Sequence, residues 1–351
     1  MRAILALPGD PETRTGGYLY DRRIRQGLEA AGWRVDLARL GDGFPAAGAA
    51  VRESATARLA ALPEGVPVIV DGLAGGVLPE GVVAAAARGP VVYLCHHALA
   101  DETGVAPADR DRLVDSERRA LKAAHRIVVT APATRRRLET AFGVPAGRIA
   151  VIEPGTDPAP IAPGTGDPPV LLCVASLTPR KGHAILIEAL SGLADRPWRL
   201  VLVGGDHHDP ACAADIGDRI ARAGLGDRIT LTGELSGEAL DKRYAEADLF
   251  VLPSYLEGYG MVLAEALARG LPIVSTKAGA IPDTVPADAG VLVEPGDAEA
   301  LRAALAPLIE DPRARARLAA GARSARGRLP DWPAQARRFA ELLHALPETA
   351  G

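Results

Sequence analysis

Short apolar segments alternate along almost the whole chain with segments whose apolar residues recur at helical spacing, as in residues 17–32 and 132–143. A first series predicts strands at residues 2–7, 34–38, 66–70, 91–95, 126–130 and 148–153. A second series predicts strands at residues 170–176, 199–204, 228–233, 249–254, 272–276 and 290–294. Such alternation favours parallel sheets that are covered by helices on both faces.

The two series are separated by residues 154–169, which read PGTDPAPIAPGTGDPP. Neither a helix nor a strand can run through so many Pro and Gly residues, so this segment predicts a linker. We therefore expect two doubly wound α/β domains facing a cleft, over residues 1–158 and 168–330. Ligands of such sheets bind beyond the carboxyl ends of the strands, so candidate chemistry is sought in the loops there.

Length and composition agree with two globular domains, because the chain has 351 residues of which 48% are hydrophobic and 24% charged. No apolar stretch approaches the roughly 18 residues that span a bilayer, and the opening apolar run is too short for a signal peptide. The 3 cysteines are widely separated. They predict neither a disulfide framework nor a zinc spacing, so a cytoplasmic location is expected.

The formal net charge of -4 does not favour a nucleic-acid partner. Residues 1–150 are nevertheless mildly basic, with 20 Lys and Arg against 17 Asp and Glu. Much of this excess lies in residues 117–139, which read ERRALKAAHRIVVTAPATRRRLE. These arginines indicate either a solvated helix face or a surface for an acidic substrate or, peripherally, the inner face of a membrane.

One carboxylate, Glu265, lies in the middle of the otherwise apolar helix predicted from MVLAEALA. A buried carboxylate needs strong hydrogen-bond donors or a partner of opposite charge. Arg269 or Lys277 would provide a structural ion pair. A ligand with two neighbouring hydroxyls is the alternative, since one carboxylate can accept from both.

The residues before this helix favour the ligand. Gly258 and Gly260 let the backbone approach a bound group closely. The unpaired amides of Tyr259, Gly260 and Met261 at the helix start attract phosphate. Phosphate-binding amides beside a carboxylate for hydroxyls describe a site for a nucleotide or a nucleotide sugar.

The surrounding run, DLFVLPSYLEGYGMVLAEALARGLPIVST, has seven residues between Glu257 and Glu265 and resembles the signature of the retaining glycosyltransferases of family four. The resemblance covers most of the chain and is strongest over residues 168–295. It implies the GT-B fold of two Rossmann-like domains, with a C-terminal helix, about residues 331–346, packing back on the first. It also implies transfer of a hexosyl group from a nucleotide diphosphate sugar to a hydroxyl acceptor, with retention of anomeric configuration.

By this resemblance, Glu257 contacts the donor sugar, Glu265 holds the ribose hydroxyls, and the amides of residues 258–261 hold the diphosphate. The segment VASLTPRKGH would place Arg180 and Lys181 over the diphosphate, stabilising the leaving group without a metal or another cofactor. The family's usual arginine is absent at Ser176. Either Arg180 replaces its charge, or the serine hydroxyl binds the phosphate.

Further roles follow from the resemblance. Gly16 and Gly17 would abut the donor phosphates. Either His96 or His97 would lie near the donor sugar, and His96 is favoured because successive residues leaving a strand point to opposite sides. The nucleotide base would be contacted, largely through backbone, by Gly233, Glu234 and Leu235.

Other classes of protein are less well supported. No dinucleotide glycine fingerprint and no phosphate loop is present. The cluster of His207, His208, Asp209 and Cys212 matches no standard metal spacing and predicts a turn. A nucleotide-sugar epimerase, a phosphorylase and a non-catalytic sugar-nucleotide binding protein remain as alternatives to a glycosyltransferase. Neither the donor base nor the acceptor is predicted.

Overall fold

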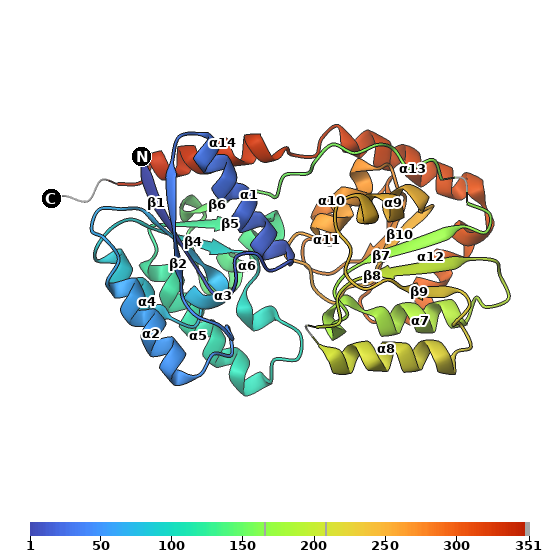
Figure 1. The fold of residues 1–351 in the computed structure, drawn as a ribbon, viewed down its shortest axis with the longest axis horizontal. Helices are drawn as coiled ribbons and strands as arrows, with labels where there is room; N and C mark the ends of the chain where they lie inside the picture. The colour runs from blue at the N-terminus through green and yellow to red at the C-terminus, as the bar shows by residue number, and fades with distance from the viewer. Residues whose placement is uncertain (165, 208, 348–351) are drawn as a thin grey trace. The chain divides into compact units, whose positions relative to one another are not determined.

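The structure is a computed structural model that describes residues 1–164, 166–207 and 209–347. The chain divides into two compact units: Met1–Gly155 with Pro330–Gly351, and Thr156–Leu329 (Figure 1). Each unit is a parallel sheet of six strands with helices on both faces, which confirms the predicted fold class. All twelve predicted strands are present. The linker, within its described residues, contains no helix or strand.

The elements of the first unit are β1 (Arg2–Leu7), α1 (Gly16–Ala30), β2 (Arg34–Arg39), α2 (Ala49–Ala60), β3 (Val68–Asp71), α3 (Gly72–Gly75), α4 (Pro79–Ala86), β4 (Val91–Cys95), η1 (Leu99–Asp101), α5 (Pro107–Ala123), β5 (Arg126–Val129), α6 (Pro132–Phe142), η2 (Ala146–Arg148), β6 (Ile149–Val151) and α14 (Trp332–His344). Its strand order is β2-β1-β3-β4-β5-β6. The order reverses between β1 and β3, which is where ligands of doubly wound sheets bind.

The elements of the second unit are β7 (Val170–Val174), η3 (Pro179–Lys181), α7 (His183–Ser191), β8 (Arg199–Val203), α8 (Pro210–Arg222), β9 (Ile229–Leu231), α9 (Glu238–Glu246), β10 (Leu249–Leu252), α10 (Met261–Ala268), β11 (Ile273–Thr276), α11 (Ile281–Thr284), β12 (Gly290–Val293), α12 (Ala298–Glu310) and α13 (Pro312–Arg326). Its strand order, β12-β11-β10-β7-β8-β9, reverses between β10 and β7. The loops that follow these two neighbouring strands are therefore the expected ligand loops.

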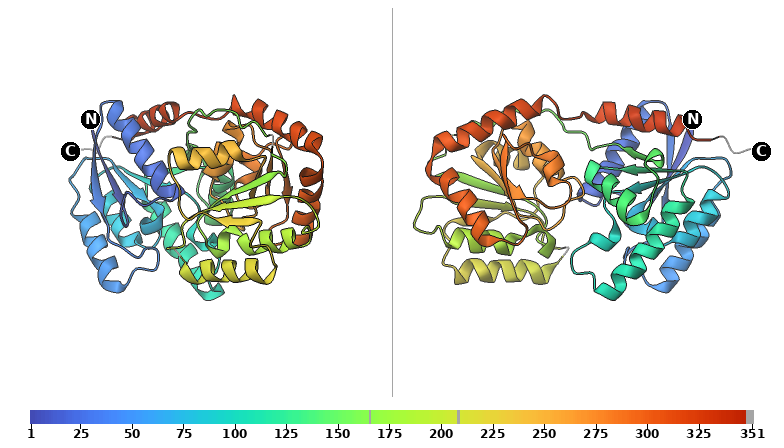
Figure 2. Two further views of the ribbon diagram at one scale, coloured as in Figure 1. Left: turned by 45° about the vertical axis from the view of Figure 1, so that its right-hand side comes forward. Right: turned by 180° about the vertical axis from the view of Figure 1, so that it is seen from behind.

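The C-terminal helix α14 packs on α1 of the first unit, and the two lie side by side in every view (Figure 2). The Tyr20 ring lies 6.1 Å from the Trp332 ring, and both side chains are buried. At the closest approach of the helices, a Cβ added to Gly27 would lie 2.3 Å from the Cβ of Ala336. Only glycine therefore fits at this point of α1.

Replacing Gly27 with alanine is expected to lower the free energy of unfolding by about 1–2 kcal/mol, because overpacking outweighs the better helix propensity of alanine. Gly217 in α8 is the matched control, since nothing lies within 4 Å of a Cβ added there. Gly217→Ala should stabilise the protein by up to about 1 kcal/mol. Urea unfolding followed by circular dichroism tests this, and shifts of the same sign in both variants would contradict it.

Glu117 of α5 is fully buried beneath the first sheet. It corrects the expectation that residues 117–139 form a solvated face throughout. One carboxylate oxygen lies 3.1 Å from the Tyr93 hydroxyl and the other accepts from the Leu99 amide at 3.0 Å. Burial raises the pKa of Glu117 from 4.5 to about 8. The protonated acid can donate to Tyr93, whose hydroxyl in turn donates to the Gly72 carbonyl at 3.3 Å.

The native state thus retains a proton on Glu117 that the unfolded chain releases above pH 4.5. Its stabilising contribution is complete below that pH and is lost as the pH rises to about 8. We expect Glu117→Gln to flatten this decline and to raise stability relative to wild type by a few kcal/mol at about pH 8. Urea unfolding at pH 5 and 8 is the measurement. Glu139→Gln, at a surface ion pair with Arg135, should leave the pH profile unchanged.

Several arginines of residues 117–139 form ion pairs at the surface of the first unit. The pairs are Arg118 with Asp115, Arg119 with Glu80, Arg135 with Glu139 and Arg137 with Asp101. These pairings favour a solvated helix face over a membrane-binding surface for this segment. No helix in the described part of the chain is both long and apolar enough to cross a bilayer.

Candidate functional site

The loop between β10 and α10 holds Glu257 in a fixed position at the switch point of the second sheet. The Thr276 hydroxyl donates to the Ser254 carbonyl at 2.5 Å, and the Ala280 amide donates to the Glu257 carbonyl at 2.9 Å. Gly260, with φ 81°, ends the loop in the left-handed region and caps α10. The end of β11 (Thr276) and the segment that follows it (Ala280) therefore anchor the loop by a hydroxyl and a backbone hydrogen bond.

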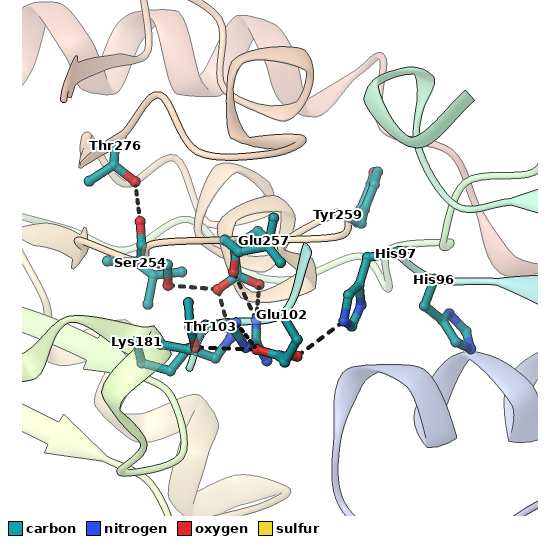
Figure 3. A network of polar contacts seen from close by, with 12 residues as sticks. His96, His97, Glu102, Thr103, Lys181, Ser254, Glu257, Tyr259 and Thr276 are labelled. Carbon is teal, nitrogen blue, oxygen red and sulfur yellow. Dashed lines mark hydrogen bonds and ion pairs between the residues drawn. The ribbon is translucent and has the colours of Figure 1, made fainter. Parts of the chain in front are cut away.

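Lys181 and Glu257 form a buried ion pair between the loops after β7 and β10 (Figure 3). The Glu257 Oε1 atom accepts from Lys181 Nζ and from the Ser254 hydroxyl, each at 2.6 Å. The two charged side chains are only 14% and 7% exposed. Burial alone would raise the pKa of Glu257, but the charges of Lys181 and Arg180 and these hydrogen bonds lower it below its ordinary value. Glu257 is thus an anion, and the structure brings together two residues that the sequence predicted separately.

Arg180 joins the same group. Its guanidinium donates to the Leu256 carbonyl at 2.8 Å and lies 3.8 Å from the second oxygen of Glu257. The following residue but one, Gly182, has φ 72°, and a Cβ there would lie 2.1 Å from the Pro253 carbonyl. A glycine is therefore required where the two loops touch. Two cations against one carboxylate give this group a net charge of +1.

Glu265 is held by no cation within the described residues. Its carboxylate accepts from the Tyr244 hydroxyl at 2.9 Å. Arg269 instead pairs with Asp241 and donates only to the backbone carbonyl of Glu265, and Lys277 pairs with Glu294 at 2.8 Å. Neither structural ion pair considered from the sequence is formed.

The Glu265 side chain is partly exposed, whereas most residues of α10 are buried. Burial nevertheless raises the pKa of Glu265, and the Tyr244 hydrogen bond and the Arg269 charge oppose this only in part. The Glu265 side chain thus has one hydrogen-bond donor in the described chain, Tyr244, and is partly open to solvent. This differs in degree from the full enclosure that the sequence predicts.

The remaining candidates of the second unit lie in loops at the same sheet edge. Ser176 follows β7 and is partly buried. The loop after β9 carries Gly233, whose carbonyl accepts from the Gly204 amide at 2.9 Å, and then Glu234 and Leu235. Glu234 lies 3.9 Å from His207. Contacts of these residues with a ligand stay predictions.

Of the cluster interpreted as a turn from the sequence, His207 and Asp209 precede α8, and the Asp209 side chain caps this helix by accepting from the Cys212 amide at 2.9 Å. His208 lies outside the described residues. The turn is confirmed for the described part of this cluster.

In the first unit, Gly16 begins α1 and Gly17 packs against His96, with an added Cβ only 3.3 Å from the imidazole. His97 has its Nε2 atom 3.1 Å from Glu102 (Figure 3). His96 turns the other way, and its Nε2 atom lies 3.3 Å from Asp21 and 3.6 Å from Asp71. The register argument thus correctly separates the two histidines, while their roles toward a donor stay predictions.

The two carboxylates beside His96 were not predicted. Burial lowers the pKa of His96, but hydrogen bonds and charges of Asp21 and Asp71 outweigh burial and raise it. Burial also raises the pKa of Asp21. Asp71 could have been identified as a candidate site residue from the sequence, because it directly follows the predicted strand 66–70. Asp21 carries no such signal, because a single Asp in an amphipathic helix usually faces solvent.

Comparison with solved structures supports the two-unit parallel-sheet fold. Sucrose-phosphate synthase from Thermosynechococcus elongatus superposes with a TM-score of 0.80 at 24% identity, over 98% of each chain. HepE of Anabaena, solved in complex with UDP-glucose, gives a TM-score of 0.78 at 21% identity, over 99% of this chain and 100% of HepE. The fold is therefore GT-B.

Family models match both units. The model of glycosyl transferases group 1 matches residues 161–325, and that of Glycosyltransferase Family 4 matches residues 73–160. The chain belongs to the glycosyl transferases group 1 family.

Two curated relatives illustrate the similarity. The GDP-mannose-dependent alpha-(1-6)-phosphatidylinositol monomannoside mannosyltransferase of Mycolicibacterium smegmatis is 32% identical over 60% of this chain and 59% of the relative. The D-inositol 3-phosphate glycosyltransferase of Kineococcus radiotolerans is 30% identical over 65% of this chain and 58% of the relative. The chain thus spans less than two thirds of the length of these relatives.

Proposed function

We propose that this protein is a retaining glycosyltransferase that moves a hexosyl group from a nucleotide diphosphate sugar to a hydroxyl acceptor. The observation that carries the proposal is the buried Lys181–Glu257 pair between the loops of β7 and β10. A purely structural ion pair could form anywhere in the fold. The loops at the point where the strand order reverses are where a doubly wound sheet is expected to bind its ligand.

The charges suit a diphosphate leaving group. Lys181 carries three donor hydrogens, of which Glu257 takes one, so the ammonium can also bind a phosphate oxygen. Arg180 adds a second cation, and the N-terminus of α10, at Met261, adds the amides that the start of a helix offers to a phosphate. Negative charge building up on the departing diphosphate would be stabilised without a metal at this position.

The two glutamates take different parts. Glu257 is ionised and fixed, so it can accept a hydrogen bond from a hydroxyl of the donor sugar. Glu265, which no cation of the described chain neutralises, accepts the two ribose hydroxyls. Retention of configuration follows from the family rather than from these contacts. It is tested by nuclear magnetic resonance of the anomeric proton of the product.

The named relatives suggest the first substrates to try. The Mycolicibacterium enzyme depends on GDP-mannose, and both relatives act on molecules that contain inositol. We therefore infer GDP-mannose as the donor and an inositol-bearing hydroxyl compound as the acceptor. UDP-, ADP- and dTDP-glucose serve as competing donors.

A thermal-shift panel of these four donors tests the proposal, because a ligand that binds only the native state raises the melting temperature. GDP-mannose should give the largest shift, and adding phosphatidylinositol mannoside or inositol 3-phosphate should then release GDP. A product formed from donor alone would indicate epimerisation or hydrolysis instead. Binding without turnover in any acceptor screen would favour a non-catalytic sugar-nucleotide binding protein.

A further inference from the structure

Three side chains with metal-binding atoms meet inside the first unit. They are Asp21 of α1, Asp71 at the end of β3 and His96 directly after β4. One donor atom from each lies within 4.8 Å of the other two. The cluster lies where the order of the first sheet reverses, between β1 and β3, which is a ligand-binding position in sheets of this kind.

The hydrogen bonding of the cluster is incomplete. One oxygen of Asp71 accepts from the Leu73 amide at 2.6 Å, which leaves the other facing His96. Asp21 is only 2% exposed, yet apart from the ion-pair contact between Asp21 and His96 Nε2 at 3.3 Å, neither a carboxylate oxygen of Asp21 nor Nε2 of His96 has a well-aligned hydrogen-bond partner among the described residues. Buried polar atoms in this condition call for a ligand, since nearly all others in proteins are paired.

Distances and charge both fit a cation. Four ligands placed tetrahedrally at about 2.0–2.1 Å from a zinc ion lie about 3.3–3.4 Å from one another. His96 Nε2 is 3.3 Å from Asp21 and 3.6 Å from Asp71. With a protonated imidazole the cluster carries a buried net charge of -1. With a divalent cation and a neutral imidazole the net charge is zero.

We propose that Asp21, Asp71 and His96 form a binding site for a divalent transition-metal cation, with Zn²⁺ as the preferred ion. One imidazole nitrogen and two carboxylate oxygens are a donor set that suits Zn²⁺. The bond from Leu73 orients Asp71 as outer-shell hydrogen bonds orient metal ligands elsewhere.

The site uses none of the residues of the Lys181–Glu257 group, and it departs from the sequence prediction that the protein holds no metal. Its existence does not depend on the proposed function. Only one consequence rests on that function: a cation bound at Nε2 competes with any donor hydroxyl for His96, so Zn²⁺ is expected to inhibit transfer.

The test uses the full-length protein after treatment with a chelator. Titration with Co²⁺ should produce the intense visible absorption of tetrahedral cobalt, saturating at one equivalent. Zn²⁺ should displace it and raise the melting temperature. Asp21→Asn and Asp71→Asn should each weaken Zn²⁺ binding at least 10-fold in calorimetry, because loss of even an outer-shell partner typically weakens metal binding by about 10- to 100-fold. Asp36→Asn, which removes an exposed carboxylate of the same unit, should leave binding unchanged.

The titrations of the wild-type protein test metal binding directly, so their result does not depend on whether the variants fold. Absence of the tetrahedral cobalt spectrum in wild type overturns the proposal. So does binding that survives in both variants, because the cation then lies elsewhere on the chain. Stoichiometric binding with no transferase activity would uphold the metal site while counting against the proposed function.

Discussion

Replacing Lys181 with methionine is expected to reduce the rate of sugar transfer by about 100-fold or more, because the developing diphosphate charge loses a buried cation. The same change leaves the buried Glu257 carboxylate with only the more distant cation, Arg180 at 3.8 Å, so the free energy of unfolding should fall by up to about 3 kcal/mol. Single-turnover kinetics at saturating donor and urea unfolding measure these effects separately. Lys277→Met, which removes an exposed lysine paired with Glu294, is the matched control and should change neither.

The double variant Lys181→Met/Glu257→Gln distinguishes a structural from a catalytic role. With both charges removed, no uncompensated carboxylate remains, so stability should return to within about 1 kcal/mol of wild type. Transfer activity should stay low. A double variant that regains activity together with stability would show that the pair serves only to hold the two loops together.

Replacing Glu265 with glutamine is expected to weaken binding of a ribonucleotide donor by about 10- to 100-fold, since hydrogen bonds to a charged group contribute about 1.5–3 kcal/mol. A donor with 2′-deoxyribose offers one hydroxyl fewer. It should bind wild type more weakly and lose less from the substitution. Isothermal titration calorimetry with both donors gives the comparison.

Two further variants serve as controls for this experiment. Tyr244→Phe removes the internal donor to Glu265 but keeps its charge, so ribonucleotide binding should persist. Glu294→Gln removes an exposed carboxylate and should have no effect. Equal losses for the ribose and deoxyribose donors in the Glu265 variant would mean that this carboxylate does not contact the ribose.

Local sequence was enough to predict the strands, because most are short apolar runs closed by turn residues. It also placed Lys181 and Glu257 at carboxyl ends of strands. Their contact could not be read from the residues alone, because it depends on β7 lying beside β10, and strand order is set by tertiary packing. The family resemblance assigned both residues to the donor site but did not predict that they form an ion pair.

The same limitation explains what was missed. Asp21, Asp71 and His96 come from three elements that meet only because β1, β3 and β4 are neighbours. Glu117 lies in a segment so rich in charged residues that a solvated helix face was the natural prediction. Its side chain is nevertheless buried and contacts the Tyr93 hydroxyl. A buried acid among exposed arginines has no signature in an amphipathic pattern.

The position of α14 in the first unit has a consequence for the order of events during synthesis. The chain leaves that unit after Gly155 and re-enters it at Pro330, so a ribosome makes the whole second unit before it makes Trp332. Until then, the apolar side of α1 around Tyr20 lacks its covering helix. The first unit therefore cannot complete its packing until the C-terminal segment has been translated. Until then this surface of α1 is accessible to chaperones and proteases.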